Sequence, residues 1–403
     1  MSKDAKNVPA LRFKGYSDAW EKRKLGDVVE RVTRKNRDLV STRPLTISAQ
    51  DGLVDQRKFF SKTVASKNIS NYFLLKAGDF AYNKSYSVGY PWGAVKRLDK
   101  YPSGVLSTLY IVFKPKKINS QFLVTYFEGT TWYVSVSKVA SEGARNHGLL
   151  NISASDFFDQ QLFFPTKKTE QESIGFTIKV LDDLIAATQY SIDALEQAKK
   201  ALLQRLFDQS WRFKGHSDPW EKRKLQELLV ERNDPSIESK TYPLMSFTGT
   251  DGVTPKGRRY DRSALVKSSS KKYKKTQKND LIYSSNNLET GSIGLNKTGN
   301  AVISPVYSVF QVTDEAIPSF MGNMILRRRF IDKMLRYRQG IMYGQWRIHE
   351  LDFLQIVVNV PQTAEQFQIG QLFSALDALI AATQSRLSSL ELLKKSLLQD
   401  LFI

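Results

Sequence analysis

One apolar segment of helical spacing occurs twice in the chain. Residues 181–207, LDDLIAATQYSIDALEQAKKALLQRLF, and residues 376–402, LDALIAATQSRLSSLELLKKSLLQDLF, are identical at 17 of 27 positions, at an offset of 195. Extended back to Ile174 and Ile369, both copies place apolar residues three and four positions apart for nearly five heptads. This spacing predicts two long helices whose apolar seams interlock along their length.

The two seams are interrupted at matching positions, by Thr188 and Thr383 and then by Lys199 and Lys394. In a parallel pair in register, the two lysines would meet in one layer and repel each other. An antiparallel pair keeps them apart, so the sequence predicts an antiparallel two-helix coiled coil with a pseudo-two-fold axis. The alternative is that each helix packs separately on its own globular domain.

A second duplicated signature opens each globular part. Residues 12–25, RFKGYSDAWEKRKL, and residues 212–225, RFKGHSDPWEKRKL, agree at 12 of 14 positions. Short β-branched and aromatic runs between clusters of Gly, Asn and Ser predict an α+β fold for both parts. The chain is therefore predicted to be a tandem of a first globular domain at 1–165, a central helix at 166–208, a second globular domain at 209–361 and a C-terminal helix at 362–403.

Charge and composition limit the environment and the partners. There is no cysteine, the N-terminus is polar, and no run approaches the ~20 apolar residues that span a bilayer, so we expect a soluble, cytoplasmic protein. The formal net charge is +20, and residues 170–207 and 365–402 carry −2 and −1, which leaves +23 for the rest. This partition predicts that the globular domains bind a polyanion, either nucleic acid or an anionic surface, and that the helices connect them.

The two copies differ most in the loops that follow Tyr82 and Tyr283. NKSYSVGYPWG, residues 83–93, stands where the second copy has SSNNLETGSIG, residues 284–294, and the alignment ends both loops on a glycine. Because equivalent positions on one scaffold carry different chemistry, we expect two related but distinct targets.

The duplicated architecture resembles the DNA-specificity (S) subunit of type I restriction-modification systems. The resemblance is carried by the tandem of variable domain and near-identical helix, by the W-E-K-R-K-L openings, and by the E-Q-x-x-I-G and L-D-x-L-I-A-A-T-Q segments, and it covers essentially the full chain. It implies two target-recognition domains that each read one half of a split, asymmetric DNA sequence. It also implies that the antiparallel coiled coil sets the spacing between the half-sites.

The resemblance further implies a set of partners and cofactors. Two modification subunits, which bind S-adenosylmethionine and methylate adenine, would attach to the helices, and restriction subunits that use ATP and Mg would join them. The specificity subunit of this family has no catalytic site and no cofactor of its own. Apolar residues beside the main seam either dock such partner helices or pack under the protein's own domains. They are Leu184, Leu203, Phe207, Leu379, Leu398 and Phe402.

Residue chemistry selects candidate DNA contacts. Arginine and lysine read guanine edges, asparagine and glutamine read adenine edges, and basic residues hold phosphates. In the first domain the candidates are Lys84, Tyr86, Tyr90, Trp92, Arg145, Asn146 and His147. In the second they are Asn286, Asn287, Tyr343, Gln345, Trp346 and Arg347, with Lys256, Arg258, Arg259, Lys271, Lys272, Lys274 and Lys275 for phosphate. The alternatives are ordinary surface packing for the loop aromatics and a solvated loop for the charge runs.

Motifs of catalysis are missing from the sequence. The three histidines share no metal-ligand spacing, and neither G-x-x-x-x-G-K-[ST] nor G-x-G-x-x-G occurs, so we expect no metal and no nucleotide site in this chain. Asp234, Glu238 and Lys240 have the spacing of a metal-nuclease trio, which is common by chance. We therefore expect a non-catalytic DNA-reading subunit, and the alternatives are a self-sufficient DNA-modifying enzyme and a nucleic-acid-binding adaptor outside restriction-modification.

Overall fold

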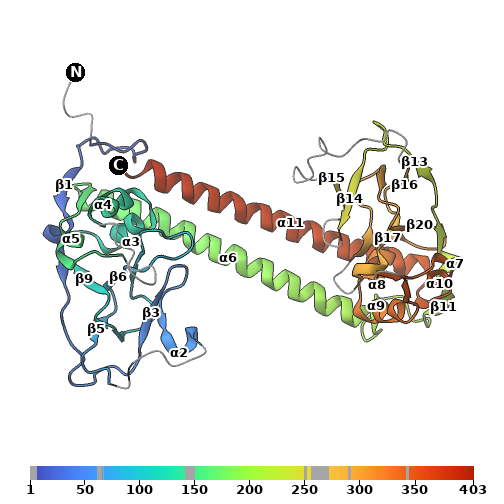
Figure 1. The fold of residues 1–403 in the computed structure, drawn as a ribbon, viewed down its shortest axis with the longest axis horizontal. Helices are drawn as coiled ribbons and strands as arrows, with labels where there is room; N and C mark the ends of the chain where they lie inside the picture. The colour runs from blue at the N-terminus through green and yellow to red at the C-terminus, as the bar shows by residue number, and fades with distance from the viewer. Residues whose placement is uncertain are drawn as a thin grey trace. The chain divides into compact units, whose positions relative to one another are not determined.

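A computed structural model of the chain describes residues 7–60, 66, 68–140, 150–248, 252–255, 272–288, 292–341 and 345–403. They form two compact units, Met1–Tyr190 with Ser385–Ile403, and Ser191–Gln384. Each unit contains one globular domain and parts of both long helices, α6 (Lys168–Phe207) and α11 (Thr363–Asp400) (Figure 1).

The first domain is built on a four-stranded antiparallel sheet. Its strand order is β2 (Val29–Arg31), β9 (Ile111–Pro115), β6 (Phe80–Asn83) and β7 (Ala94–Arg97). Three antiparallel pairs surround it, β1 (Glu21–Lys24) with β10 (Gln161–Phe164), β3 (Leu45–Ser48) with β4 (Gly52–Asp55), and β5 (Phe73–Lys76) with β8 (Ser103–Leu106). The helices are α1 (Leu25–Val28), α2 (Gln56–Phe59), α3 (Ser120–Glu128), α4 (Thr131–Val139) and α5 (Ala154–Phe158).

The second domain repeats this topology. Its main sheet has the order β12 (Leu229–Glu231), β20 (Ser308–Val312), β17 (Leu281–Tyr283) and β18 (Ile293–Leu295). Around it lie β11 (Glu221–Lys224) with β23 (Val357–Val360), β14 (Met245–Thr248) with β15 (Gly252–Pro255), β13 (Pro235–Ser236) with β16 (Tyr273–Thr276) and β19 (Ala301–Ile303), and β21 (Gln339–Ile341) with β22 (Gln345–Arg347). The helices are α7 (Leu225–Leu228), the 3-10 turn η2 (Ser285–Asn287), α8 (Pro318–Ile325), α9 (Arg328–Leu335) and α10 (Glu350–Leu354). The predicted α+β tandem is confirmed.

The ends of the long helices complete the hydrophobic cores. In the first unit, Phe402 near the end of the chain packs against Trp20 and Phe122, with ring centroids 6.2 and 5.6 Å apart. In the second unit, Phe207 at the end of α6 packs in the same way against Trp220 and Phe320, at 5.7 and 5.4 Å. Each domain is therefore held by the start of the helix that follows it and by the end of the other long helix.

The duplicated R-F-K-G and E-Q motifs are the two halves of one contact. Arg12 donates to both carboxylate oxygens of Glu170, at 2.7 and 2.9 Å, and Arg212 donates to Glu365 at 3.0 and 2.6 Å. Both glutamates are 1% exposed, so their charges are compensated almost entirely by these guanidinium groups. The acidic residue in the first helical turn thus fixes the start of each long helix to the opening of its domain.

The following E-Q-x-x-I-G positions bring the helix close to the domain. Gln171 donates to the Pro165 carbonyl at 2.8 Å and accepts from the Asn119 amide at 2.8 Å, so it joins the helix start to the N-cap of α3. A Cβ on Gly175 would lie 2.8 Å from the backbone nitrogen of Phe122. Only glycine lets α6 lie this close to the first turn of α3.

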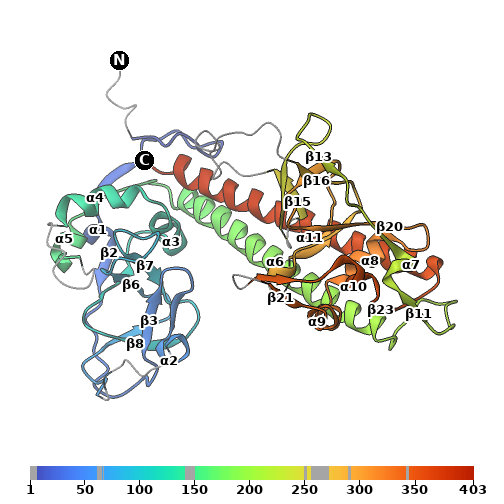
Figure 2. The ribbon, with the colours of Figure 1, turned by 45° about the vertical axis from the view of Figure 1, so that its right-hand side comes forward.

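The long helices run antiparallel to one another in both units (Figures 1 and 2). In the first unit the Lys394 ammonium lies 2.5 Å from Asp182 of α6 and 2.8 Å from Glu128 of α3. In the second unit Lys199 lies 2.5 Å from Asp377 of α11. The predicted antiparallel pairing is confirmed, and the lysines that interrupt the seams are partly buried in equivalent interhelical ion pairs.

Candidate nucleic-acid interface

The two central strands place the divergent loops at corresponding positions of the two domains. β6 and β17 end near Tyr82 and Tyr283, and both rings are fully buried, stacked on Phe157 at 4.6 Å and packed on Phe353 at 4.9 Å. Burial raises the pKa of both phenols, so the hydroxyl groups keep their protons and act as hydrogen-bond donors. Each loop therefore begins at a rigid, aromatic anchor in its sheet.

A tight turn displays the loop of the first domain. Ser87 and Tyr90 exchange backbone hydrogen bonds at 3.3 and 2.8 Å, and the Tyr82 hydroxyl donates to the Trp92 carbonyl at 2.8 Å. Gly93 has φ +80°, and a Cβ there would collide with the Asn83 carbonyl oxygen, so glycine is required where the loop returns to β7. Tyr86, just before this turn, is 59% exposed.

The other predicted contacts of this loop serve partly to build it. Lys84 donates to the Ile152 carbonyl at 3.1 Å, and the Leu150 amide donates to the Lys84 carbonyl at 2.9 Å. Tyr90 and Trp92 are half-buried and pack against the two cores of the unit. The loop is thus joined to the segment that follows Arg145, Asn146 and His147, which lie outside the described residues.

A cavity of about 310 Å³ opens beside this loop. Its walls come from the β3–β4 hairpin, from α2 and from residues 83–94. Gln50 at the hairpin tip and Phe59 of α2 line it together with Tyr86 and Tyr90. Sequence reasoning missed Gln50 and Phe59, although the Asp51-Gly52 pair between two apolar runs is a hairpin signal that would have placed Gln50 at a tip.

In the second domain the structure brings together two of the predicted segments. The Asn286 side-chain oxygen accepts a hydrogen bond from the Trp346 amide at 2.7 Å, and the Ser285 hydroxyl accepts from the Ile348 amide at 2.9 Å. Trp346 is 46% exposed on β22, and the Arg338 guanidinium lies 5.4 Å from its ring centroid. Arg338 was missed from the sequence because its position depends on the β21–β22 hairpin, which sequence patterns did not reveal.

Basic residues also lie along β16 and just before it. Lys275 lies 3.0 Å from Asp234 and 5.2 Å from the Tyr242 ring centroid, and Lys272 is exposed just before the strand. Lys274 lies 3.9 Å from Glu350. Asp234, the first member of the nuclease-like trio, is therefore engaged by a lysine of the neighbouring strand.

Glu350 connects the lysine strand to the tryptophan hairpin. Arg347 lies 3.5 Å from its carboxylate, and the Ser308 hydroxyl donates to it at 2.9 Å. Partial burial opposes ionisation of Glu350, but hydrogen bonds from its own backbone and Ser308, with the charges of Lys274 and Arg347, leave its pKa below the ordinary value. The result is a polar, ionised network around Trp346.

Several predicted contacts are not described in full. Lys256, Arg258, Arg259, Lys271 and Tyr343 lie outside the described residues, and of Asn287 and Gln345 the structure gives only the backbone, in η2 and β22. DNA contact by any of the candidates stays a prediction.

The six apolar residues predicted to dock partners divide into three groups. Phe207 and Phe402 are buried in the cores of their own units, so a docking role for them is wrong, because the helix ends continue into those cores. Leu203 and Leu398 are half-buried against the same cores. Leu184 and Leu379 are exposed on the two helices, at 38% and 50%, and remain candidates.

Strand register corrects one part of the sequence alignment. The aligned loops were expected to end on Gly93 and Gly294. Gly294 instead lies inside β18 opposite Ile282, the position that Lys96 takes opposite Ala81 in the first domain. The alignment failed because the two loops differ in sequence throughout, and only the ladder hydrogen bonds define which residues correspond.

Among the described residues, none of the helices has the combined length and apolar character needed to cross a membrane. In the same part of the chain, no group of three or more histidine, aspartate or glutamate side chains is arranged to hold a metal ion.

Comparison with known proteins identifies the fold. No protein-family model matches the chain, and no curated protein matches it. Among solved structures it is similar to the S subunit of a type I restriction-modification system from M. genitalium, with 15% identity and a TM-score of 0.60 over 98% of this chain and 99% of that one. It is also similar to the HsdS subunit from Thermoanaerobacter tengcongensis, with 15% identity and a TM-score of 0.50 over 96% and 98%. A chain from a study of assembly and conformational transition of the type I R-M system matches with 14% identity and a TM-score of 0.50 over 95% and 97%. The resemblance found in the sequence is thus confirmed at the level of architecture: this chain has the fold of the S subunits of type I restriction-modification systems.

Proposed function

We propose that this chain is the sequence-specific DNA-binding subunit of a type I restriction-modification complex. Each globular domain reads one half of a bipartite, asymmetric target through its divergent loops, and the antiparallel helices fix the spacer between the halves. The chain has no catalytic role and supplies no cofactor. Methyl transfer and cleavage belong to two modification subunits and to ATP-dependent restriction subunits, which use S-adenosylmethionine, ATP and Mg.

One observation supports this proposal above the others, namely that two domains of one topology present different side chains from equivalent loops. The first domain displays Tyr86 from its loop beside Gln50 of the β3–β4 hairpin, and the second displays Asn286 from its loop beside Trp346 of β22 and Arg338. Glutamine, asparagine and arginine are the residues that read base edges, and exposed aromatic rings stack on or contact bases. The basic composition of the domains supplies affinity for the phosphate backbone.

The helices are suited to the spacer role because each is continuous from one unit into the other. α6 runs from Lys168 to Phe207 and α11 from Thr363 to Asp400, and both cross the boundary between the units. At 1.5 Å per residue, a helix of this size is about 60 Å long, which exceeds the roughly 34 Å of one turn of B-DNA. Exposed Leu184 and Leu379 are proposed to contact the modification subunits.

The first test is DNA binding by the complex of this chain with its modification subunits. Adenine methylation is mapped across a genome with and without the gene, and the motif found should be split and asymmetric. Binding to a duplex carrying that motif should fall steeply with salt. Binding that is indifferent to sequence and salt would contradict the proposal, and methyl transfer or cleavage by this chain alone would favour the enzyme alternative.

The second test separates the two domains. Residues 1–160 are replaced by those of a relative with a different specificity, and methylated sites are mapped again. Only one half of the motif should change, because each domain carries its own loops and core. A change in both halves would show that the domains do not read independently.

A further inference from the structure

The second unit contains a cavity that the proposed function does not use. It has a volume of about 720 Å³ and is lined by α6, by α8 with the start of α9, and by α11. The α6 wall is a single helix face, Glu196, Lys199, Lys200, Leu203 and Gln204. A volume of this order is typical of sites for small organic ligands, which span about 300–1,000 Å³.

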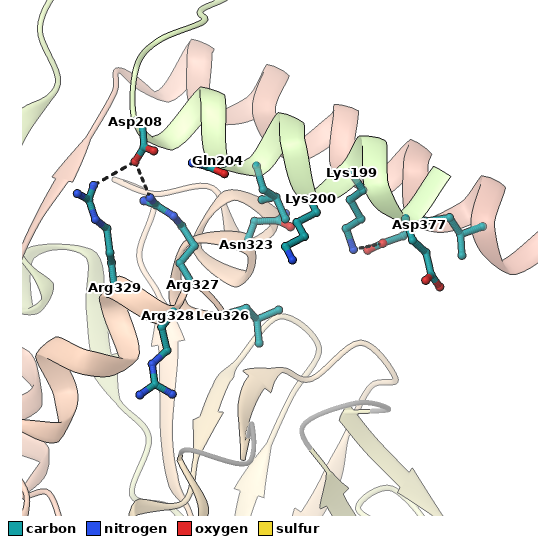
Figure 3. A pocket seen from close by; sticks show the side chains of 13 residues that line it. Lys199, Lys200, Gln204, Asp208, Asn323, Leu326, Arg327, Arg328, Arg329 and Asp377 are labelled. Carbon is teal, nitrogen blue, oxygen red and sulfur yellow. Dashed lines mark hydrogen bonds and ion pairs between the residues drawn. The ribbon is translucent and has the colours of Figure 1, made fainter. Parts of the chain in front are cut away.

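Basic side chains dominate the polar groups of this cavity. Five cationic residues line it with three carboxylates: Lys199, Lys200, Arg327, Arg328 and Arg329 with Glu196, Asp208 and Asp377. Figure 3 shows Arg327 and Arg329 directed at Asp208, and the Lys200 ammonium extending from α6 toward the α8–α9 side. Arg328 is paired with Asp332 at 2.9 Å and Lys199 with Asp377 at 2.5 Å, so the excess of positive charge rests on Lys200 and on the two arginines that share Asp208.

Two guanidinium groups share a single carboxylate oxygen. Arg327 and Arg329 lie 3.2 and 3.1 Å from the same Asp208 Oδ1. The Arg327 guanidinium also lies 4.6 Å from the Phe207 ring centroid, and its half-buried position lowers its pKa. Two guanidinium groups that share one carboxylate leave a net charge of about +1, which a further anion would neutralise. Planar guanidinium groups fit the oxygens of phosphate in particular.

In the first unit, the position that corresponds to this cavity is occupied by charged side chains of the protein itself. α3 of the first unit corresponds to α8 of the second, and Phe122 is equivalent to Phe320. The backbone nitrogens of these two residues lie against the equivalent glycines Gly175 and Gly370. With this alignment, Glu128 is equivalent to Leu326. Glu128 lies 2.8 Å from Lys394, whereas Leu326 offers no charge to the equivalent Lys199.

The residues after Glu128 and Leu326 differ in charge as well. Gly129-Thr130-Thr131 in the first domain stands where the second has Arg327-Arg328-Arg329. Lys96, which shares the charged cluster of Glu128 and Lys394, is replaced by Gly294 in the strand register. The second unit thus lacks the side chains that occupy this position in the first unit and carries guanidinium groups around it.

From these observations we infer that the cavity at the end of α6 is an anion site that takes the phosphate group of a ligand. Lys200, Arg327 and Arg329 hold the phosphate, and Leu203, Leu326 and Ile380 contact the rest of the ligand. The phosphate belongs either to a free organic phosphate or to the backbone of a bound nucleic acid. The site breaks the two-fold equivalence of the units.

The test is calorimetric titration of the full chain with inorganic pyrophosphate at low ionic strength. Leu326→Glu places at the cavity the carboxylate that the first unit has as Glu128, and it should lower the affinity about tenfold, because this carboxylate competes with the phosphate for the basic side chains. Leu326 is exposed, so this variant should fold normally, which circular dichroism checks.

A matched pair of lysine variants gives the control. Lys200→Gln should weaken pyrophosphate binding, whereas Lys395→Gln, the same exposed helix position in the other unit, should leave it unchanged. Equal losses in both variants, no binding by the wild-type chain, or no effect of Leu326→Glu would overturn the inference. Tighter binding of an oligoglutamate peptide than of pyrophosphate would do so too, in favour of a carboxylate partner.

The salt dependence of binding to a DNA duplex of arbitrary sequence distinguishes the two sources of phosphate, a free organic phosphate and the nucleic-acid backbone. If backbone phosphate enters the cavity, Leu326→Glu should lower the slope of log affinity against log salt by about one. If a free organic phosphate is the ligand, the slope should stay the same while the affinity for pyrophosphate falls about tenfold. Pyrophosphate binding needs no target sequence, so its failure would leave the proposed function untouched.

Discussion

At the scale of residues, the duplicated motifs of the sequence are explained by contacts at the start of each long helix. Arg12 with Glu170, and Arg212 with Glu365, are bidentate ion pairs between residues more than 150 positions apart. A buried carboxylate without its partner is far more costly than the pair. Both motifs are therefore needed together, which accounts for their duplication together.

Removal of Arg12 should destabilise the first unit strongly. Arg12→Met leaves Glu170 buried without a counter-charge, and we expect a loss of about 3–5 kcal/mol. Hydrogen exchange followed by mass spectrometry, at residues of the first unit, measures this loss. Lys14→Met, at an exposed position of the same motif, is the control and should have little effect. If the two variants behave alike, the pair does not stabilise the unit.

Gly175 is a second residue whose identity is set by a contact. Gly175→Ala places a methyl group 2.8 Å from the Phe122 nitrogen, which belongs to the backbone of α3 and cannot turn away. We expect a loss of about 1–3 kcal/mol in the free energy of unfolding of the first unit, measured with denaturant. Ser173→Ala, at a half-buried position of the same helical turn whose hydroxyl donates to the Thr169 carbonyl of its own helix, should change stability by less than about 0.5 kcal/mol. An alanine that is tolerated at position 175 would show that α6 can move away from α3.

At the scale of elements, the helix seams combine apolar packing with two equivalent ion pairs. Lys394 with Asp182, and Lys199 with Asp377, join the helices within the first and the second unit. A lysine at a seam position is tolerated only in an arrangement that supplies a carboxylate, and the antiparallel one does so twice. The polar interruptions therefore help to specify the direction of the helices.

The Lys394 pair gives a prediction for stability at high pH. Partial burial opposes its charge, but Glu128 and Asp182 outweigh burial and raise its pKa above 10.5. Its contribution to stability is therefore present below pH 10.5 and is lost as the pH rises through the higher folded value. Lys394→Met should lower the denaturation midpoint of the first unit at neutral pH, and the difference from wild type should shrink above pH 10.5. Lys395→Met is the exposed control, and a difference that stays constant with pH would contradict the assigned role.

At the scale of the whole molecule, the two helices are proposed to act as the spacer between the half-sites. Seven residues inserted after both Tyr190 and Gln384 add one heptad to each helix and keep the seams in register. The added rise is about 10.5 Å, or roughly three base pairs at 3.4 Å each. Methylation mapping should show unchanged half-sites with a longer spacer. An insertion in only one helix should disrupt the pairing, and altered half-site sequences in the double insertion would contradict the spacer role.

How much of this protein follows from its sequence depends on how local each feature is. Periodicity, duplication and charge in the sequence predict four features. They are the long helices, their antiparallel pairing, the tandem of α+β domains and the basic character of the domains. These signals repeat over many residues, so they survive single ambiguities. The starts of the candidate loops after Tyr82 and Tyr283 were also located correctly, because they interrupt a repeated frame, whereas the end of the second loop was not, since Gly294 lies inside β18.

Only the tertiary structure decided which side chains meet. It assigned Phe207 and Phe402 to cores, joined Asn286 to Trp346, placed Arg338 over that ring, and brought three arginines to the end of α6. Each of these contacts joins segments far apart in the chain, and no local pattern encodes such a pairing. Periodicity reports which face of an element is apolar, whereas the partner of that face is set by how all the elements pack together.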